Sequence, residues 1–386
     1  AFLFGWTLLL VIQTGTIAAV AVAFARFLGV IWPVLGSRIW FGWGSAGISG
    51  ERAGAILVIA LLTFANLRGL NMGRLVQNSF TTAKIAALIV IVVAGCVLLP
   101  NPDAIRANFA SHAAFFGTGR WSLAYGGAFG AAMVGAIFSA DAWATVTFTA
   151  SEVRNPKRDL PLALALGSGG VILLYLLTNV AYLCALPAVG DPAGMTVFAR
   201  GIAHATSDRV ATAAMQVLWG GRGATFTAFA VMISTFGCAN GLILTGARVI
   251  YAMAHDRVFL QAGARLNTAN VPALALVIQA VWAALLAISG SYSELLDYVV
   301  FAQLIFYVLT VSAVFVLRRR FPSANRPYRA WGYPIVPAIY IIAALLLMGD
   351  LLIERPHSTW PGLLIVLSGV PVYAIFLRNK RSRVIE

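Results

Sequence analysis

Ten apolar segments recur along this chain, and they limit its fold more than any other feature of the sequence. About 20 helical residues cross the hydrocarbon core of a bilayer, and each segment is close to that length or longer. Sixty per cent of the 386 residues are hydrophobic, above the roughly one half that is usual for soluble domains. We therefore expect a polytopic integral membrane protein, with spans at residues 3–32, 53–68, 78–99, 126–150, 161–187, 223–253, 272–289, 294–317, 332–353 and 360–377.

The basic residues are distributed unevenly between the two sets of alternating connections. Of the 27 Lys and Arg residues, 17 lie in one set together with the C-terminal tail, and eight lie in the other. Because cytoplasmic loops are enriched in Lys and Arg, the richer side is predicted to be cytoplasmic. Ten crossings then place both ends of this chain in the cytoplasm. The net charge of +14 follows this membrane pattern and does not indicate a nucleic-acid partner.

Residues typical of metal sites and enzymes do not cluster in the sequence. The three cysteines (Cys96, Cys184 and Cys238) lie inside apolar segments, without a CxxC motif or a disulfide framework. The four histidines are far apart in polar connections, at His112, His204, His255 and His357. No phosphate-binding glycine loop, nucleophile elbow or zinc signature occurs. We expect no catalytic residue, no metal site and no cofactor.

The stretch 126–161 contains the most unusual residue of any span, Asp141, near the predicted midplane. A carboxylate at that depth is unfavourable by a few kcal/mol unless it faces water, a ligand or a partner. The β-branched run Thr145–Val146–Thr147 follows, which predicts an interrupted helix. Broken helices occur in membranes where freed backbone groups line a cavity, and in transporters they face the substrate. The alternative is a continuous helix whose Asp141 pairs with a buried neighbour.

Lys84 is the second charge expected deep in the membrane, one or two turns into its span. Its stem could extend to the cytoplasmic interface. Alternatively, its ammonium stands where a coupling cation would bind and holds neighbouring helices together.

Polar side chains in three other spans are also candidates for ligand contact. They are Thr235, Cys238 and Asn240 in the sixth span, Thr16 and its neighbours in the first, and Gln303 in the eighth. Small and hydroxyl-bearing residues equally favour close helix packing, and a lone amide favours an interhelical hydrogen bond.

Four segments together resemble the amino acid–polyamine–organocation transporters, above all the L-type amino acid transporter branch and its bacterial relatives. They are RGLNMGRLVQNSFTTAK (68–84), AIFSADAWATVTFTASEVRNPKRDLPLAL (136–164), FGCANGLILTGARVIYAMAHD (236–256) and LLDYVVFAQLIFYVLTVSAVFVLRRRFPSANRPYRAWGYPIVP (295–337). The resemblance implies an all-α, LeuT-like fold with a five-plus-five inverted repeat and two peripheral helices. About ten of the twelve transmembrane helices would be present, in one transporter domain over residues 1–386. The chain opens on Ala1, and we expect it to begin at the family's third helix, without the first two.

The resemblance also assigns roles to individual residues. Phe138 matches the aromatic gate, Ser139, Ala140 and Asp141 match the unwound backbone that receives the substrate's amino group, and Trp143 follows them; Thr16 and Gln303 join this substrate-binding set. Asp141 stands where the L-type branch often has glycine. Lys84 matches the lysine that replaces a sodium ion, with Thr235 and Cys238 as its neighbours, and Glu152 with Arg154 forms a cytoplasmic gate.

These expectations define a secondary active transporter of amino acids that works by alternating access in the plasma membrane, in this reading a bacterial inner membrane. It would be independent of sodium and would act by proton symport or by exchange. The partners implied are an amino acid, protons and the lipid bilayer, without a disulfide-linked accessory subunit. The alternatives are a transport-inactive sensor or partner subunit of the same fold, and a transporter of polyamines or cationic amino acids. A membrane-embedded enzyme and a channel fit the residue pattern less well.

Overall fold

The computed structural model describes residues 2–36, 39–43, 46–69, 74–110, 123–141, 143, 146, 153, 155–259, 261–290, 292–324, 326 and 329–382. The α-helices are α1 (Phe2–Thr7), α2 (Gln13–Ile31), α3 (Gly50–Leu67), α4 (Arg74–Val93), α5 (Pro102–Phe109), α7 (Leu123–Ala140), α8 (Pro156–Ala185), α9 (Val197–Arg200), α10 (Val210–His255), α11 (Ala273–Ser289), α12 (Tyr292–Arg320), α13 (Ile335–Glu354) and α14 (Pro356–Ser382). Shorter pieces are the π-helices η1 (Leu8–Ile12) and η3 (Ala94–Leu98), the 3-10 turns η2 (Pro33–Leu35), η5 (Thr206–Asp208) and η6 (Gln261–Ala264), and strands β1 (Ile39–Trp43) and β2 (Ala46–Ser49).

Within these described residues, eight helices are long and apolar enough to cross a membrane, and two shorter apolar helices accompany them. The eight are Phe2–Ile31, Gly50–Leu67, Asn78–Leu98, Pro156–Ala185, Val210–His255, Tyr292–Arg320, Ile335–Glu354 and Pro356–Ile375, and the shorter two are Gly126–Ala140 and Ala273–Ser289. Each of the ten predicted segments therefore corresponds to an apolar helix.

Two of the segments contain an interruption of the helix. In the fourth, which was expected to run to residue 150 with a break near Thr145, the α-helix ends a little earlier, at Ala140. In the sixth, which was expected to begin at residue 223, α10 has a preceding helical piece from Val210 and bends at Gly220, whose φ of 64° is left-handed. Glycine reaches that conformation without the steric penalty of a Cβ, so the chain can turn there and resume a helix.

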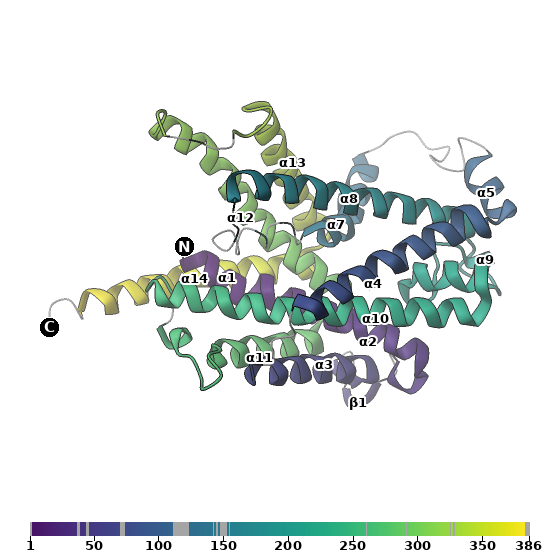
Figure 1. Cartoon of the computed structure of the whole chain (residues 1–386), viewed down its shortest axis with the longest axis horizontal. Helices are drawn as coiled ribbons and strands as arrows, with labels where there is room; N and C mark the ends of the chain where they lie inside the picture. The colour runs from purple at the N-terminus through teal and green to yellow at the C-terminus, as the bar shows by residue number, and fades with distance from the viewer. Residues whose placement is uncertain are drawn as a thin grey trace.

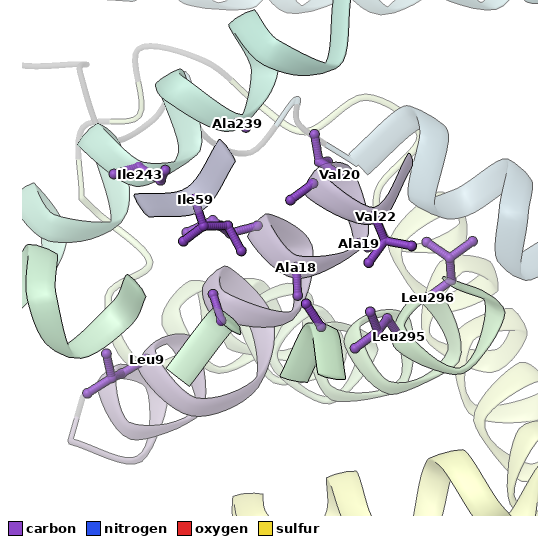
Figure 2. Close-up of a cluster of buried hydrophobic side chains, with 14 of the residues drawn as sticks. Leu9, Ala18, Ala19, Val20, Val22, Ile59, Ala239, Ile243, Leu295 and Leu296 are labelled. Atoms are coloured by element: carbon purple, nitrogen blue, oxygen red, sulfur yellow. The ribbon is translucent and has the colours of Figure 1, made fainter. Parts of the chain in front are cut away.

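The centre of the molecule is the second half of the first span. Helix α2 contacts α3, α10, α11 and α12, and its Ile17, Ala18, Ala19 and Ala21 are fully buried. Figure 2 shows Ala18 and Ala19 in one buried cluster with Ile59 of α3 and with Leu295 and Leu296 of α12. Small residues let helices approach closely in a membrane, where packing replaces the hydrophobic effect as the attraction between helices. This core provides a firm scaffold.

The elements that carry the polar residues of interest lie on one side of this scaffold. Helix α10 contacts α2, α3 and α11 and also contacts α4 and α8. In Figure 1, α4, α7 and α8 lie above α10, and α3 and α11 lie below it. Helix α7 contacts α8, α12 and α13. The apolar face of α8 is exposed over the part of the chain that the structure describes.

Candidate functional site

The C-terminal end of α7 is the first component of the site. The α-helix ends at Ala140, and Asp141, Trp143 and Val146 follow in 3-10 geometry. Over the described residues the α-helix does not continue past Ala140, which favours the predicted interruption over the continuous helix. The last carbonyls of a helix lack intrahelical donors, and the Tyr175 hydroxyl of α8 donates to one of them, the Ser139 carbonyl, at 3.3 Å. The end of α7 is thus held by α8.

The Asp141 carboxylate accepts hydrogen bonds from two neutral side chains of α12. Gln303 Nε2 donates to Asp141 Oδ2 at 2.6 Å, and the Tyr307 hydroxyl donates to Asp141 Oδ1 at 2.8 Å. Gln303 Nε2 also lies 3.0 Å from the Tyr307 oxygen. These two residues are four apart on one helix, so they project from the same face. The structure brings together two of the predicted substrate-site residues, Asp141 and Gln303.

Aromatic rings enclose this polar cluster. Trp143 packs on the Tyr307 ring, with 5.4 Å between the ring centroids. Phe138 is partly buried, one turn before Asp141, and packs against the cluster of Leu8, Ile12 and their neighbours. An aromatic side chain, a carboxylate and a helix end therefore meet where α7 passes α12.

The remaining two predicted substrate contacts are in different situations. Ala140 is exposed at the last position of α7. Thr16 is partly buried, and its hydroxyl donates to the Ile12 carbonyl of its own chain segment at 2.6 Å.

Lys84 lies on α4 facing α10. The structure brings Lys84 near enough to Cys238 for an electrostatic interaction between them. Phe80, one turn earlier on α4, packs beside Phe236, with 6.3 Å between the ring centroids, and covers the α10 backbone at Gly237. The lysine is only half-buried within the described residues.

Thr235 bonds within its own helix. The Thr235 hydroxyl donates to the Val231 carbonyl at 2.8 Å, within α10 itself. Glu152 and Arg154 lie outside the described residues.

Two tyrosines of the site were missed by the sequence reasoning. Tyr307 follows Gln303 by one helical turn, so the spacing of polar residues in the eighth span could have revealed it. Tyr175 is followed one helical turn later by Thr178 and Asn179 in an otherwise apolar helix, and this spacing could also have revealed it. In the structure it contacts the Ser139 carbonyl and also lies near Cys238, between the end of α7 and the lysine.

Two further carboxylates, one buried and one partly buried, lie near helix ends. Asp297 on α12 is 5% exposed and faces Arg355 and Ser358. Asp350 on α13 faces the α7 backbone at Gly130, and its Oδ2 has no hydrogen-bond donor among the described residues. Neither was singled out from the sequence.

Comparison with known proteins decides the family. The amino acid permease family matches residues 1–376. This chain belongs to it. The LeuT-like fold and the absence of an enzymatic role follow from that membership, because the family consists of membrane transporters.

Individual relatives are similar over nearly the whole chain. It is 29% identical to the b(0,+)-type amino acid transporter 1 of Rattus norvegicus, over 98% of this chain and 72% of the relative. It is 28% identical to the serine/threonine exchanger SteT of Bacillus subtilis, over 99% of this chain and 79% of the relative. It is 25% identical to the human cystine/glutamate transporter, over 98% of this chain and 69% of the relative.

Proposed function

We propose that this member of the amino acid permease family exchanges amino acids across the plasma membrane by alternating access, without sodium. One observation supports this proposal most directly: α7 ends at Ala140, inside an apolar span, beside a polar cluster of Asp141, Gln303 and Tyr307. The substrate would lie between Phe138 and Asp141, with its amino group at the freed carbonyls. One of the similar proteins, SteT of Bacillus subtilis, is named a serine/threonine exchanger, which supports exchange over proton symport.

Independence from sodium rests on Lys84. Its ammonium reaches the α4–α10 interface at Cys238, where it supplies one fixed positive charge. A sodium ion at the same interface would face that charge at short range in a medium of low dielectric constant, which is strongly unfavourable. The Lys84 ammonium therefore stands in for a sodium ion between α4 and α10. Transport would then need no sodium gradient.

The Asp141 carboxylate favours one second candidate, a carrier of cationic amino acids or polyamines. Both of its hydrogen-bond partners are neutral, and it forms no ion pair with a described residue. The C-terminal end of a helix carries a partial negative charge, which adds to that of the carboxylate. A substrate with a second positive charge would balance both. A neutral amino acid of medium size would instead rely on Phe138.

Three further features belong to the proposed function. The whole protein would contain two helices before this chain, consistent with the greater length of the relatives and with the exposed face of α8. Glu152 and Arg154 would close the cytoplasmic gate. Both ends of the chain would lie in the cytoplasm, as its basic residues predict.

Uptake into proteoliposomes that contain the complete protein tests these points together. Radiolabelled serine, leucine and arginine are offered with and without an internal amino acid, a sodium gradient and a pH gradient. We expect uptake that depends on internal amino acid and is unaffected when choline replaces sodium. A strict sodium requirement would overturn the role of Lys84. Substrate binding without uptake under every gradient would favour a transport-inactive sensor.

A further inference from the structure

Two of the three cysteines, distant in the sequence, meet at one end of the molecule. Cys96 lies in η3, which continues α4, and Cys184 lies in the last turn of α8. Their thiols lie near enough to each other to interact electrostatically. The sequence reasoning treated both as isolated apolar residues, because 88 positions separate them.

The backbones of the two helices are pressed together beside these thiols. A Cβ placed on Gly95 would lie 2.9 Å from the Ala181 carbonyl oxygen and 3.1 Å from its Cα. The amide of Asn101 donates to the Cys184 carbonyl at 2.9 Å. A disulfide needs α-carbons within about 7 Å of each other, and these contacts bring the two backbones together one residue before Cys96 and three residues before Cys184.

Neighbouring contacts fix the same region from a second direction. The Asn108 side chain of α5 donates to the Leu183 carbonyl at 2.7 Å and to the Leu186 carbonyl at 2.8 Å. Its own oxygen accepts from the Ala188 amide at 2.7 Å. The end of α8 is therefore anchored on both sides of Cys184, whose thiol nonetheless stays partly exposed, like that of Cys96.

The charge distribution predicts that this end of the molecule lies outside the cytoplasm. Both α4 and α8 follow connections rich in basic residues, Arg68 with Arg74 and Lys157 with Arg158, so their opposite ends carry the cysteines to the outer side. Thiols on that side of a plasma membrane meet an oxidising environment, in which disulfides form and persist.

We propose that Cys96 and Cys184 form a reversible disulfide that joins the outer ends of α4 and α8. The oxidant is a disulfide donor, either a small-molecule disulfide or a protein disulfide. One cysteine thiolate attacks the donor and releases its first thiol, giving a mixed disulfide. The second cysteine attacks that bond, the intramolecular S–S bond forms, and the donor leaves as its second thiol. Two electrons and two protons pass from the cysteines to the donor.

The bond would act on the site described above, a consequence that rests on the proposed transport function. Helix α4 carries Lys84, and α8 carries Tyr175, which holds the end of α7. A covalent link between these helices limits any movement of one along the other. Oxidation is therefore expected to slow transport, and reduction to restore it.

Counting of cysteine thiols tests the bond without any measurement of transport. The complete protein in detergent is incubated with oxidised glutathione or with dithiothreitol, denatured, and alkylated with a polyethylene-glycol maleimide. We expect two fewer alkylated cysteines in the oxidised sample, and a Cys96–Cys184 crosslinked peptide by mass spectrometry. Cys96→Ser and Cys184→Ser should each abolish the difference of two, and the matched variant Cys238→Ser should keep it.

Two results would overturn the proposal. One is an unchanged thiol count in oxidised protein that elutes as a single folded species. The other is a difference of two that survives in Cys96→Ser. A confirmed bond in a protein that transports no amino acid would leave the disulfide standing and reject the proposed function.

Discussion

At the scale of single residues, the position of one carboxylate matters most. Asp141 follows directly on the last residue of α7, and its two oxygens are occupied by donors from one face of α12. Neutral donors orient a carboxylate without cancelling its charge. The same two donors therefore decide how much of that charge a substrate meets.

Tyr307→Phe is expected to shift selectivity toward cationic substrates. The change removes one hydrogen bond to a charged group, worth about 1.5–3 kcal/mol, and keeps the ring that packs on Trp143. Asp141 Oδ1 then has a free lone pair that the guanidinium of arginine can bind. The KM for arginine should fall roughly tenfold, and the KM for leucine should change little. Competition uptake in proteoliposomes measures both values.

Tyr340→Phe is the matched control for that experiment. Tyr340 on α13 lies near Asp141, and no hydrogen bond between them appears among the described contacts. Its selectivity should resemble that of the unaltered protein. Equal shifts in both variants would contradict a specific role for the Tyr307 hydroxyl.

Lys84→Ala is expected to reduce transport to background. The variant loses the positive charge at the α4–α10 interface beside Cys238, which no other described cation supplies there. Size-exclusion chromatography in detergent should show a folded protein. Lys157→Ala, an exposed lysine at the start of α8, serves as the control. Normal uptake by folded Lys84→Ala would refute the proposed role.

At the scale of elements, the contact between α4 and α8 connects both parts of the site. Gly95 lies against the Ala181 backbone, with no space for a side chain. Helices of a membrane protein pack closely where small residues face each other, so this contact sets their separation. Tyr175 lies six residues before Ala181 on α8. The hydrogen bond from its hydroxyl to the Ser139 carbonyl depends on that separation.

Gly95→Ala is expected to destabilise the protein by about 1–3 kcal/mol, as overpacking of a tight interface does. The new methyl group would meet backbone atoms, which cannot rotate away as a side chain can. Gly349→Ala on α13 is the control, because a Cβ there meets no described atom within 4 Å. Thermal unfolding in detergent should show a lower Tm for Gly95→Ala alone. Equal Tm values would contradict the close packing.

At the scale of the whole molecule, one side is firmly packed and the other is open. Helices α2, α3, α10 and α11 contact one another (Figure 1) and share a buried apolar core. By contrast, the apolar window of α8 contributes no buried residue over the described part of the chain. An apolar face of that extent must be covered by lipid or by further protein.

The complete protein is expected to bind its amino acid substrate more tightly than residues 1–386 alone. The relatives that this chain matches are longer, and we propose that two preceding helices complete the site beside α7. Scintillation proximity binding with the same labelled amino acid compares the two forms. Equal affinity would show that the described helices are sufficient and would reject the proposed contribution.

The sequence by itself determined the membrane fold and most of its spans. Apolar segments of bilayer length leave the backbone no alternative to helices, because unpaired amides in hydrocarbon are too unfavourable. It also indicated where the α7 helix ends, because an acid and a β-branched run oppose a helix locally. The α-helix ends at Ala140, ten residues before the expected limit of the apolar segment. The sequence could not predict this exact position, because α-helical and 3-10 turns share the same apolar composition.

Only the tertiary structure decided which polar side chains meet. Asp141 and Gln303 lie 162 positions apart, and Cys96 and Cys184 lie on different helices. Composition and periodicity describe one helix at a time, whereas these contacts depend on how far each helix is rotated and shifted against its neighbour. Small residues such as Gly95 and Ala181 set those rotations, because a helix settles where its backbone can come closest.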